Sequence, residues 1–148
     1  MRFQQLAFGL PSLSVARPYC SDSCFSSINS LNFDACRDAV STDRLSTLRC
    51  TCSSGAFLQS IALCIEDHCQ SEQTAWSPVH HSCTLRAGIA ISGFEDALSG
   101  AREQAISYPA NASTPLYQPV TIPSSIFEPA YLSAYAFKHN LDAAVSTG

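Results

Sequence analysis

An apolar stripe at helical spacing is the clearest pattern in the chain and follows the polar pair Ser53 and Ser54. Its members recur three and four positions apart and are Phe57, Leu58, Ile61, Cys64 and Ile65. This spacing places them on one face of an α-helix, and a serine just before the first turn is a preferred helix cap. The pattern predicts a central core helix that begins after Ser53 or Ser54.

A second helical pattern begins near residue 20. Its apolar positions have the spacing i, i+4 and i+7 and are Cys24, Ile28 and Leu31. Ser21 or Asp22 can cap this helix. Because residues four apart share a helix face, we expect the thiols of Cys20 and Cys24 to point together toward the core if the helix begins early enough.

The segment between the third and fourth cysteines predicts a shorter element. Ser41 or Thr42 can cap a short turn that carries Leu45 and Leu48 inward. The Cys-x-Cys pair at residues 50–52 follows directly. In a strand its two sulfurs would point to opposite faces, which suits two different bridges.

Two further helices are expected after the core helix. Ser71 can cap one that runs through Trp76, and Pro78, which lacks an amide hydrogen, disrupts or ends this helix before Cys83. A capping-box sequence at residues 92–95 begins the other. Its apolar face consists of Phe94, Ala97, Leu98, Ala101 and Ala105. Gly100 weakens this helix.

The C-terminal part of the chain has a different pattern. Five of the eight prolines lie between Pro109 and Pro129, among Ser, Thr and small residues, and such a segment cannot form a continuous helix or a central strand. We therefore expect a short helical extension over residues 86–107. Residues 108–148 are expected to form a Pro-rich, flexible and disordered tail, with a weak amphipathic turn or two between Tyr131 and Val145 as the alternative.

All the cysteines lie in one segment of the chain. They are Cys20, Cys24, Cys36, Cys50, Cys52, Cys64, Cys69 and Cys83. An even number of cysteines at this density is typical of the disulfide framework of a secreted protein, and each bridge contributes about 2–4 kcal/mol by restricting the unfolded chain. Spacing alone leaves the pairing open.

The N-terminus has the parts of a secretory signal. Arg2 precedes an apolar stretch, and Ser14-Val15-Ala16 is a small-x-small cleavage sequence, so we expect residues 1–16 to be a signal peptide. Asn111-Ala112-Ser113 is a glycosylation sequon that a secreted chain can use. We therefore expect an extracellular protein, with a cell-wall or membrane-associated location as one form of it.

Charge and apolar length exclude two classes of partner. The formal net charge is −4 and the basic residues do not cluster, so a nucleic-acid partner is not expected. No stretch of apolar residues has the length of a membrane-spanning helix. We expect no transmembrane span in this chain.

Motifs for catalysis and for zinc are also missing. The sequence contains no Gly-rich phosphate loop, HExxH or GxSxG, and a Cys/His nucleophile pair would need a free thiolate. Cys50, Cys52, Cys64, His68 and Cys69 lie close together in sequence, but they lack the repeated Cys-x2-4-Cys pair of structural zinc sites. The chain is not expected to be an enzyme.

The cysteine order, with its local sequence context, points to a known family. Pro18 and Tyr19 precede Cys20, Thr42-Asp43 precedes the Cys50-Thr51-Cys52 triplet, and Cys64, Cys69 and Cys83 follow at ordered spacings. This series resembles the CFEM domain, the eight-cysteine module of fungal extracellular membrane proteins. The resemblance implies a mostly α-helical basket with four disulfides over residues 17–85.

Some members of that family bind ferric haem on a flat apolar platform, with an aspartate between the third and fourth cysteines as the axial iron ligand. The resemblance implies Asp43 for this role, because Thr42-Asp43 matches the Thr-Asp pair of the family, and Asp38 is the alternative. An ionised carboxylate favours ferric over ferrous iron. Otherwise Asp43 serves as a helix N-cap or first-turn acid.

Six apolar side chains are candidates for the haem surface or, alternatively, for the core. They are Phe25, Phe33, Leu45, Leu48, Phe57 and Trp76. The expected function is extracellular haem or iron binding. Two alternatives remain open: a secreted effector or adhesion module that keeps the scaffold without haem and binds a host or cell-surface protein, and the ectodomain fragment of a larger membrane receptor.

Overall fold

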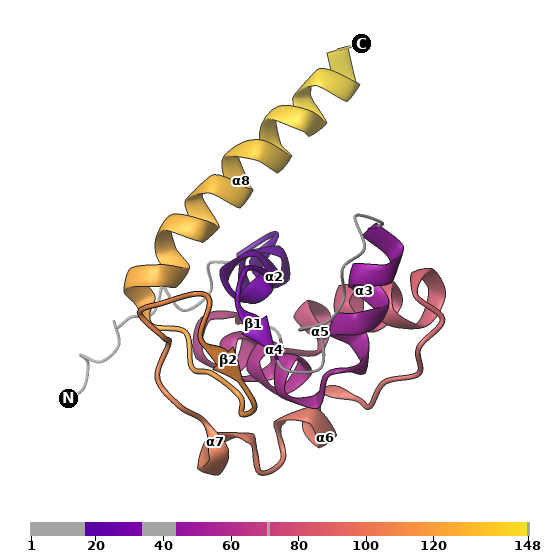
Figure 1. The fold of residues 1–148 in the computed structure, drawn as a ribbon. Coiled ribbons are helices and arrows are strands. Elements are labelled where there is room, and N and C mark those ends of the chain that lie inside the picture. The colour runs from indigo at the N-terminus through magenta and orange to yellow at the C-terminus, as the bar shows by residue number, and fades with distance from the viewer. Residues whose placement is uncertain (1–16, 34–43, 71, 148) are drawn as a thin grey trace, which may run out of the picture.

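The fold is given by a computed structural model, which describes residues 17–33, 44–70 and 72–147. Cys36, Asp38, Asp43, Ser71 and the expected signal peptide lie outside the described residues. Helices form most of the described chain (Figure 1). Their bounds are α2 Cys20–Asn29, α3 Arg44–Ser53, α4 Gly55–His68, α5 Glu72–His81, the π-helix η2 Ser82–Arg86, α6 Phe94–Leu98, α7 Ala101–Gln104 and α8 Ser124–Thr147. This confirms the mostly α fold.

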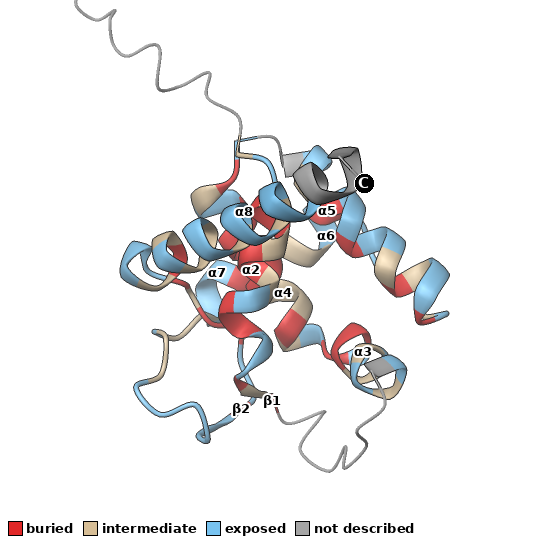
Figure 2. Cartoon of the chain, turned by 90° about the horizontal axis from the view of Figure 1, so that it is seen from above, coloured by how far each residue is buried: buried red, intermediate tan, exposed pale blue. Residues whose placement is uncertain are grey.

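Helix α4 is the centre of the core. Its cap is Ser54, whose side chain accepts a hydrogen bond from the Phe57 amide. The predicted stripe is confirmed, since Phe57, Ile61, Cys64 and Ile65 are all buried. Helices α2, α3, α5, α6 and α7 all contact α4. Figure 2 shows the buried residues concentrated where α2 and α4 meet.

Helix α2 begins at Cys20, one residue before the expected caps. Ser21 and Asp22 lie inside the helix, and its N-cap is Tyr19, which has a left-handed backbone (φ 66°) and makes no side-chain cap bond. The predicted cap is therefore wrong. The early start nevertheless points both Cys20 and Cys24 into the core, where they are buried, as expected.

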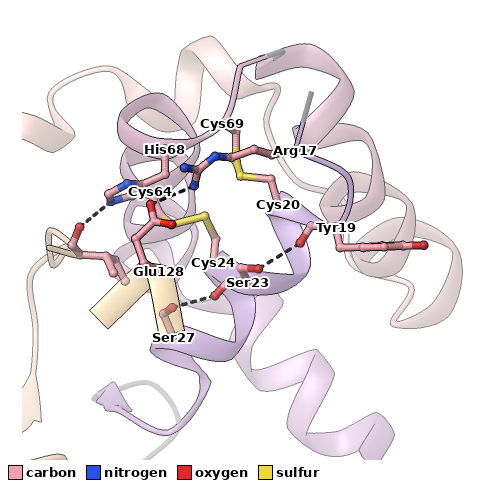
Figure 3. Close-up of a disulfide and its surroundings, with 11 residues drawn as sticks. Arg17, Tyr19, Cys20, Ser23, Cys24, Ser27, Cys64, His68, Cys69 and Glu128 are labelled. Atoms are coloured by element: carbon pink, nitrogen blue, oxygen red, sulfur yellow. Dashed lines mark hydrogen bonds and ion pairs between the residues drawn. A yellow bond between two sulfur atoms is a disulfide. The ribbon is translucent and has the colours of Figure 1, made fainter. Parts of the chain in front are cut away.

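Disulfides join the helices to one another, and Figure 3 shows the bridges of α2. The bridges between described residues are Cys20–Cys69, Cys24–Cys64 and Cys52–Cys83. The first two fasten α2 to α4 and its C-cap, and the third fastens α3 to η2. Cys50 is also disulfide-bonded. The Cys-x-Cys pair thus serves two different bridges, although it lies in helix α3 and not in a strand.

After α4, one local prediction is confirmed and another is wrong. Helix α5 passes through Pro78 and ends at His81, before Cys83, as predicted, and the π-helix η2 follows it directly. Trp76 and Val79 are buried on either side of the proline, so packing outweighs the missing amide bond. At α6 the N-cap is Gly93 and makes no side-chain bond, so the capping box does not form.

Gly100 divides the next predicted helix. Its backbone is left-handed (φ 74°), a conformation that glycine adopts at little cost. The chain therefore forms two short helices, α6 and α7, on either side of it. The expected weakening at Gly100 is confirmed, in a stronger form than a single weak helix.

The proline-rich segment is extended, as expected, but it packs against the core. Strand β2 (Pro115–Leu116) pairs in parallel with β1 (Asn32–Phe33). An isolated parallel bridge joins Ile106 to Val120. The side chains of Leu116, Val120, Ile122 and Phe127 are buried. The expected disordered tail therefore does not describe residues 108–127.

Helix α8 follows this segment and packs against α2. Its C-terminal half extends away from the other helices (Figure 1). No single helix in the described ranges is long and apolar enough to cross a membrane. Helices α3 and α4 together meet the length and composition test, but they are bent by 82° at their junction, and α4 is the core helix.

Candidate ligand-binding groove

A groove of about 530 Å³ opens between helices α2, α3, α5, η2 and α8. Figure 1 shows α8 and α3 on opposite sides of α2. This volume is within the range of small-molecule sites, about 300–1,000 Å³. The groove is therefore large enough for a small organic ligand or cofactor.

Apolar side chains form much of the groove wall. The apolar residues that line it include Phe25 of α2, Leu48 of α3, Val79 of α5 and Phe137 of α8. Phe25 is held in place by edge-to-face packing on Phe57, with ring centroids 5.2 Å apart. Phe137 is 66% exposed. The wall thus offers apolar surface that the fold itself leaves uncovered.

Small side chains on α8 keep the groove open beside α2. Ala130, Ser133 and Ala134 line it, and their spacing of three and four puts them on one helix face. Larger residues at these positions would reduce the space. The groove is thus a consequence of the sequence of α8, not only of the position of that helix.

Charged groups are few among the described residues that line the groove. They are Asp22 of α2, Arg86 of η2 and Lys138 of α8. Lys138 Nζ lies 3.9 Å from Asp22 Oδ2, and both side chains are substantially exposed. No described carboxylate lies within ion-pair distance of Arg86. Two cations therefore face one carboxylate at this site.

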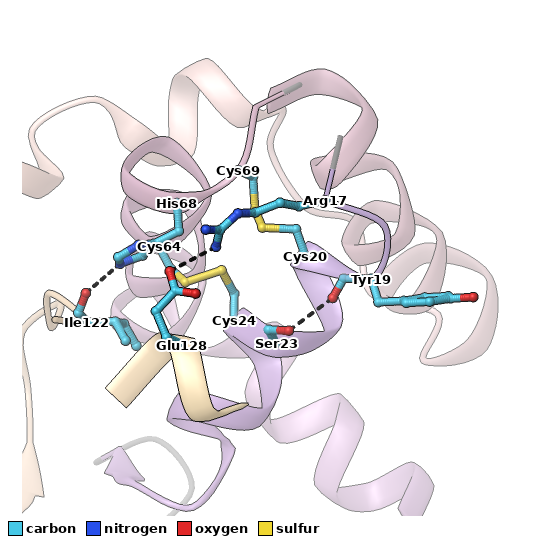
Figure 4. Close-up of polar contacts among 10 residues, drawn as sticks. All are labelled: Arg17, Tyr19, Cys20, Ser23, Cys24, Cys64, His68, Cys69, Ile122 and Glu128. Carbon is cyan, nitrogen blue, oxygen red and sulfur yellow. Dashed lines mark hydrogen bonds and ion pairs between the residues drawn. A yellow bond between two sulfur atoms is a disulfide. The ribbon is translucent and has the colours of Figure 1, made fainter. Parts of the chain in front are cut away.

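The base of α8 is fixed by contacts to α4 and to the start of the described chain (Figure 4). Arg17 Nη1 lies 3.0 Å from Glu128 Oε2, and its guanidinium lies over the rings of Phe127 and Tyr131. The ring of His68 stacks on Phe127 with centroids 4.3 Å apart. These contacts fix the wall that α8 gives to the groove.

His68 and Tyr131 have structural roles in the packing around α8. His68 Nε2 lies 2.7 Å from the Ile122 carbonyl oxygen, so this histidine is hydrogen-bonded within the fold. Burial raises the pKa of Tyr131, although the nearby charge of Arg17 acts in the opposite direction. Both residues thus belong to the packing of α8.

The two acidic side chains at the end of α4 form ion pairs within the fold. Arg102 of α7 binds both Glu66 and Asp67, and the hydrogen bond to Glu66 is the main cause of the raised pKa of Arg102. No group of three or more His, Cys, Asp or Glu residues in the described part of the chain could hold a metal ion.

The proposed iron ligands from the sequence, Asp43 and Asp38, lie outside the described residues. Asp43 directly precedes Arg44, the first residue of α3, in the sequence. Leu48 of the same helix lines the groove, about one helical turn or 6 Å of rise beyond Arg44. In the sequence, therefore, Asp43 adjoins a helix that forms part of the groove wall.

The six apolar candidates divide between core and groove. Phe33, Phe57 and Trp76 are buried in the core. Phe25 and Leu48 line the groove, and Leu45 is 37% exposed on α3. The groove residues Asp22, Arg86, Phe137 and Lys138 were not identified from the sequence as members of a site. They come from three distant segments, and no local spacing connects them.

Asn111 lies in an exposed turn of the segment between α7 and β2. Its Oδ1 accepts a hydrogen bond of 2.8 Å from the Ser113 amide. Both sequon positions are therefore on the surface of the folded chain.

Comparison with known proteins gives no assignment: no protein-family model, no curated protein and no solved structure matches this chain. The fold itself is a small, mostly helical module with eight cysteines in its sequence and three disulfides between described residues. These features are compatible with a CFEM-like domain.

Proposed function

We propose that this chain is a secreted CFEM-type module that binds ferric haem outside the cell, in the groove beside α3. The observation that carries the proposal is the apolar groove of about 530 Å³, formed in part by the helix that follows the Thr42-Asp43 pair in sequence. The cysteine order and the disulfide-linked helices support the same family.

The described groove residues fit a large apolar cofactor. Phe25, Leu48 and Phe137 provide aromatic and aliphatic surface that is partly or largely exposed. Haem, if bound, would supply an iron for which an ionised carboxylate is a suitable ligand. Asp43 is the proposed ligand and Asp38 the alternative, both from the family resemblance. The ligand must be ionised, so acid weakens binding.

Titration of the oxidised protein with ferric haem tests this function. We expect a shift of the Soret band that saturates at one haem per chain. Asp43→Ala removes the shift, whereas Asp38→Ala retains it. In Asp22→Asn, which removes the one carboxylate among the described groove residues, the shift should be retained at saturating haem.

Three results would contradict parts of the proposal. An unchanged spectrum in both the Asp43 and Asp38 variants would overturn the axial aspartate. Loss of the shift in Asp22→Asn alone would move the ligand to α2. The absence of any Soret shift in the unaltered protein would overturn haem binding.

A protein-interaction role is the second candidate. It is favoured by the C-terminal half of α8, where Phe137 and Leu141 are 66% and 48% exposed and lie four positions apart, on one face of a helix that extends from the module. Exposed apolar residues on a helix are typical of helix-in-groove recognition. A secreted effector or adhesion module would bind a host or cell-surface protein through this helix and show no Soret shift. Leu141→Glu would remove that binding.

Secretion and glycosylation at Asn111 belong to the same proposal. In a eukaryotic secretory host, the full chain should enter the medium and lose mass on treatment with a glycosidase. Asn111→Gln should remove that mass change. The third alternative, a fragment of a larger receptor, predicts apolar spans encoded downstream in the same gene.

A further inference from the structure

The groove has a cation on each of two separate elements. Arg86 is the last residue of η2, and Lys138 lies on α8. Lys138 is the single lysine of the sequence. The chain as a whole carries a formal charge of −4, so the charge at this apolar site is opposite in sign to that of the molecule.

The ion pair between Lys138 and Asp22 leaves the ammonium group accessible. The N–O distance of 3.9 Å is long, and the two side chains are 41% and 45% exposed. Exposed pairs of this kind contribute little to stability. A ligand carboxylate can therefore bind Lys138 without a large loss of existing interactions, while Asp22 holds the ammonium group near the groove.

Arg86 has greater capacity for an anion. No carboxylate of the described residues lies within ion-pair distance of it. A guanidinium presents a planar set of N–H donors that matches a carboxylate in a bidentate arrangement. Its place in the lining of an apolar groove is suited to a molecule with an apolar body and a charged end.

We propose that the groove selects an apolar ligand that carries carboxylates, with Arg86 and Lys138 as the carboxylate-binding residues and Asp22 as a positioning residue for Lys138. The inference rests on the proposed function, because haem, with its two propionates, is an apolar ligand that carries carboxylates. It does not depend on the iron ligand, because the cations act on the carboxylates.

Metal-free protoporphyrin IX separates the two proposals. It keeps both propionates and lacks the iron, and its fluorescence reports binding to the oxidised full chain. We expect binding that weakens about tenfold in Arg86→Gln and about tenfold in Lys138→Gln, because each variant removes a charge-assisted interaction with a carboxylate. Arg86→Lys and Lys138→Arg should retain most of the affinity.

Matched variants show whether the effect belongs to the groove. Arg49→Gln removes the same unit of charge from α3, where Arg49 Nε donates to the Ala87 carbonyl and does not line the groove. Its affinity for protoporphyrin should be unchanged. Asp22→Asn should weaken binding less than Lys138→Gln, because it removes the group that positions the ammonium but leaves the ammonium itself. A rise from about 0.05 to 0.5 M salt should weaken binding by the unaltered chain.

Lys138 also gives a direct readout of ligand contact. Because it is the single lysine, an amine-reactive ester modifies one side chain, and the terminal amine serves as the internal reference. Protoporphyrin should slow acylation of Lys138 and not that of the terminus. A fluorescent long-chain fatty acid, tested in the same way, shows whether a single carboxylate on a flexible chain is also accepted.

Each outcome has a defined meaning. If Arg86→Gln and Lys138→Gln bind protoporphyrin as the unaltered chain does, the inference is wrong. If haem gives a Soret shift but protoporphyrin does not bind, haem binding stands and carboxylate selection by the groove is overturned. If protoporphyrin binds through both cations and haem gives no shift, the inference stands and the iron-ligand proposal fails.

Discussion

The Ser60 hydroxyl connects two segments that are far apart in sequence. It is fully buried on α4, donates to the Ala56 carbonyl at 2.7 Å and accepts from the Val120 amide at 2.8 Å. Ser60→Ala leaves a buried amide without a partner, so we expect the free energy of unfolding to fall by about 1–3 kcal/mol. Urea unfolding with the disulfides intact measures this.

Ser53→Ala is the control for that prediction. Ser53 is exposed, and its hydroxyl bonds only to the Arg49 carbonyl within α3. We expect a change within about 0.5 kcal/mol. Equal losses in the two variants would show that the bond to Val120 does not hold the proline-rich segment on the core.

Tyr108 gives the fold a dependence on alkaline pH. Its hydroxyl donates to the Ser27 carbonyl at 2.7 Å, and burial raises the pKa of this phenol above its ordinary value of 10.0. The folded chain therefore holds the proton more tightly than the unfolded chain. This contribution is complete below pH 10 and is lost as the pH rises toward the folded pKa.

Chemical unfolding at several alkaline pH values tests this effect. Between about pH 9 and 11 the stability of Tyr108→Phe should fall less than that of the unaltered chain, because the ionising group is gone. Tyr117→Phe is the matched control, since Tyr117 is 65% exposed. A parallel fall in Tyr108→Phe would assign the alkaline loss to other groups.

Helix caps show what the sequence can predict at the scale of residues. Ser54 caps α4 as predicted, because it directly precedes a strong apolar stripe. At the starts of α2 and α6 several neighbouring polar residues could each serve as the N-cap, so the sequence alone does not select one. Contacts with other parts of the fold determine where these two helices begin. The Ser23 hydroxyl bonds to the Tyr19 carbonyl, and the Ser92 carbonyl accepts from the Trp76 indole. Asp43 and Asp38 remain predictions as iron ligands.

At the scale of elements, the docking of α8 depends more on an aromatic ring than on an ion pair. Phe127 is fully buried between His68 and Tyr131, whereas the Arg17–Glu128 pair is partly exposed. We expect Phe127→Ala to lower the free energy of unfolding by about 3–5 kcal/mol. Glu128→Gln should lower it by at most about 1 kcal/mol. Urea unfolding compares the two variants.

Limited proteolysis of the same variants reports on α8 itself. Phe127→Ala should be cut rapidly near the start of α8, and Glu128→Gln should be cut at the rate of the unaltered chain. If the charge variant is the more easily cut, the ion pair holds the helix and the order of the two effects is reversed.

The elements that could be predicted are those with a periodic apolar face. Helices α2 and α4 have one. The helix through Trp76 and its end before Cys83 were also predicted, the end from Pro78. The segment at residues 105–123 has no period, because its prolines exclude both helix and regular strand. It is ordered by distant partners instead: Ile106 with Pro119 and Thr121, and Val120 with Ser60. Such partners have no signature in the local sequence.

At the scale of the whole molecule, the groove was not predicted because no local pattern encodes it. Asp22, Arg86 and Lys138 lie on three helices that the fold brings together. The cysteines allowed a better prediction than the groove residues did, since their number and order predicted a disulfide-linked helical module. Their pairing became known only from the structure, in which α2 is bridged twice to α4 and its C-cap.

The same bridges fasten three of the helices that line the groove, α2, α3 and η2. The three between described residues join positions 31, 40 and 49 apart in sequence, and each contributes about 2–4 kcal/mol. Their combined effect is comparable with the whole stability of a small domain, about 5–15 kcal/mol. We therefore expect full reduction to remove most helical circular dichroism and, with it, binding of protoporphyrin. Reoxidation should restore both. A chain with eight titratable thiols and unchanged helix content would show that the apolar core around α4 is sufficient without the bridges.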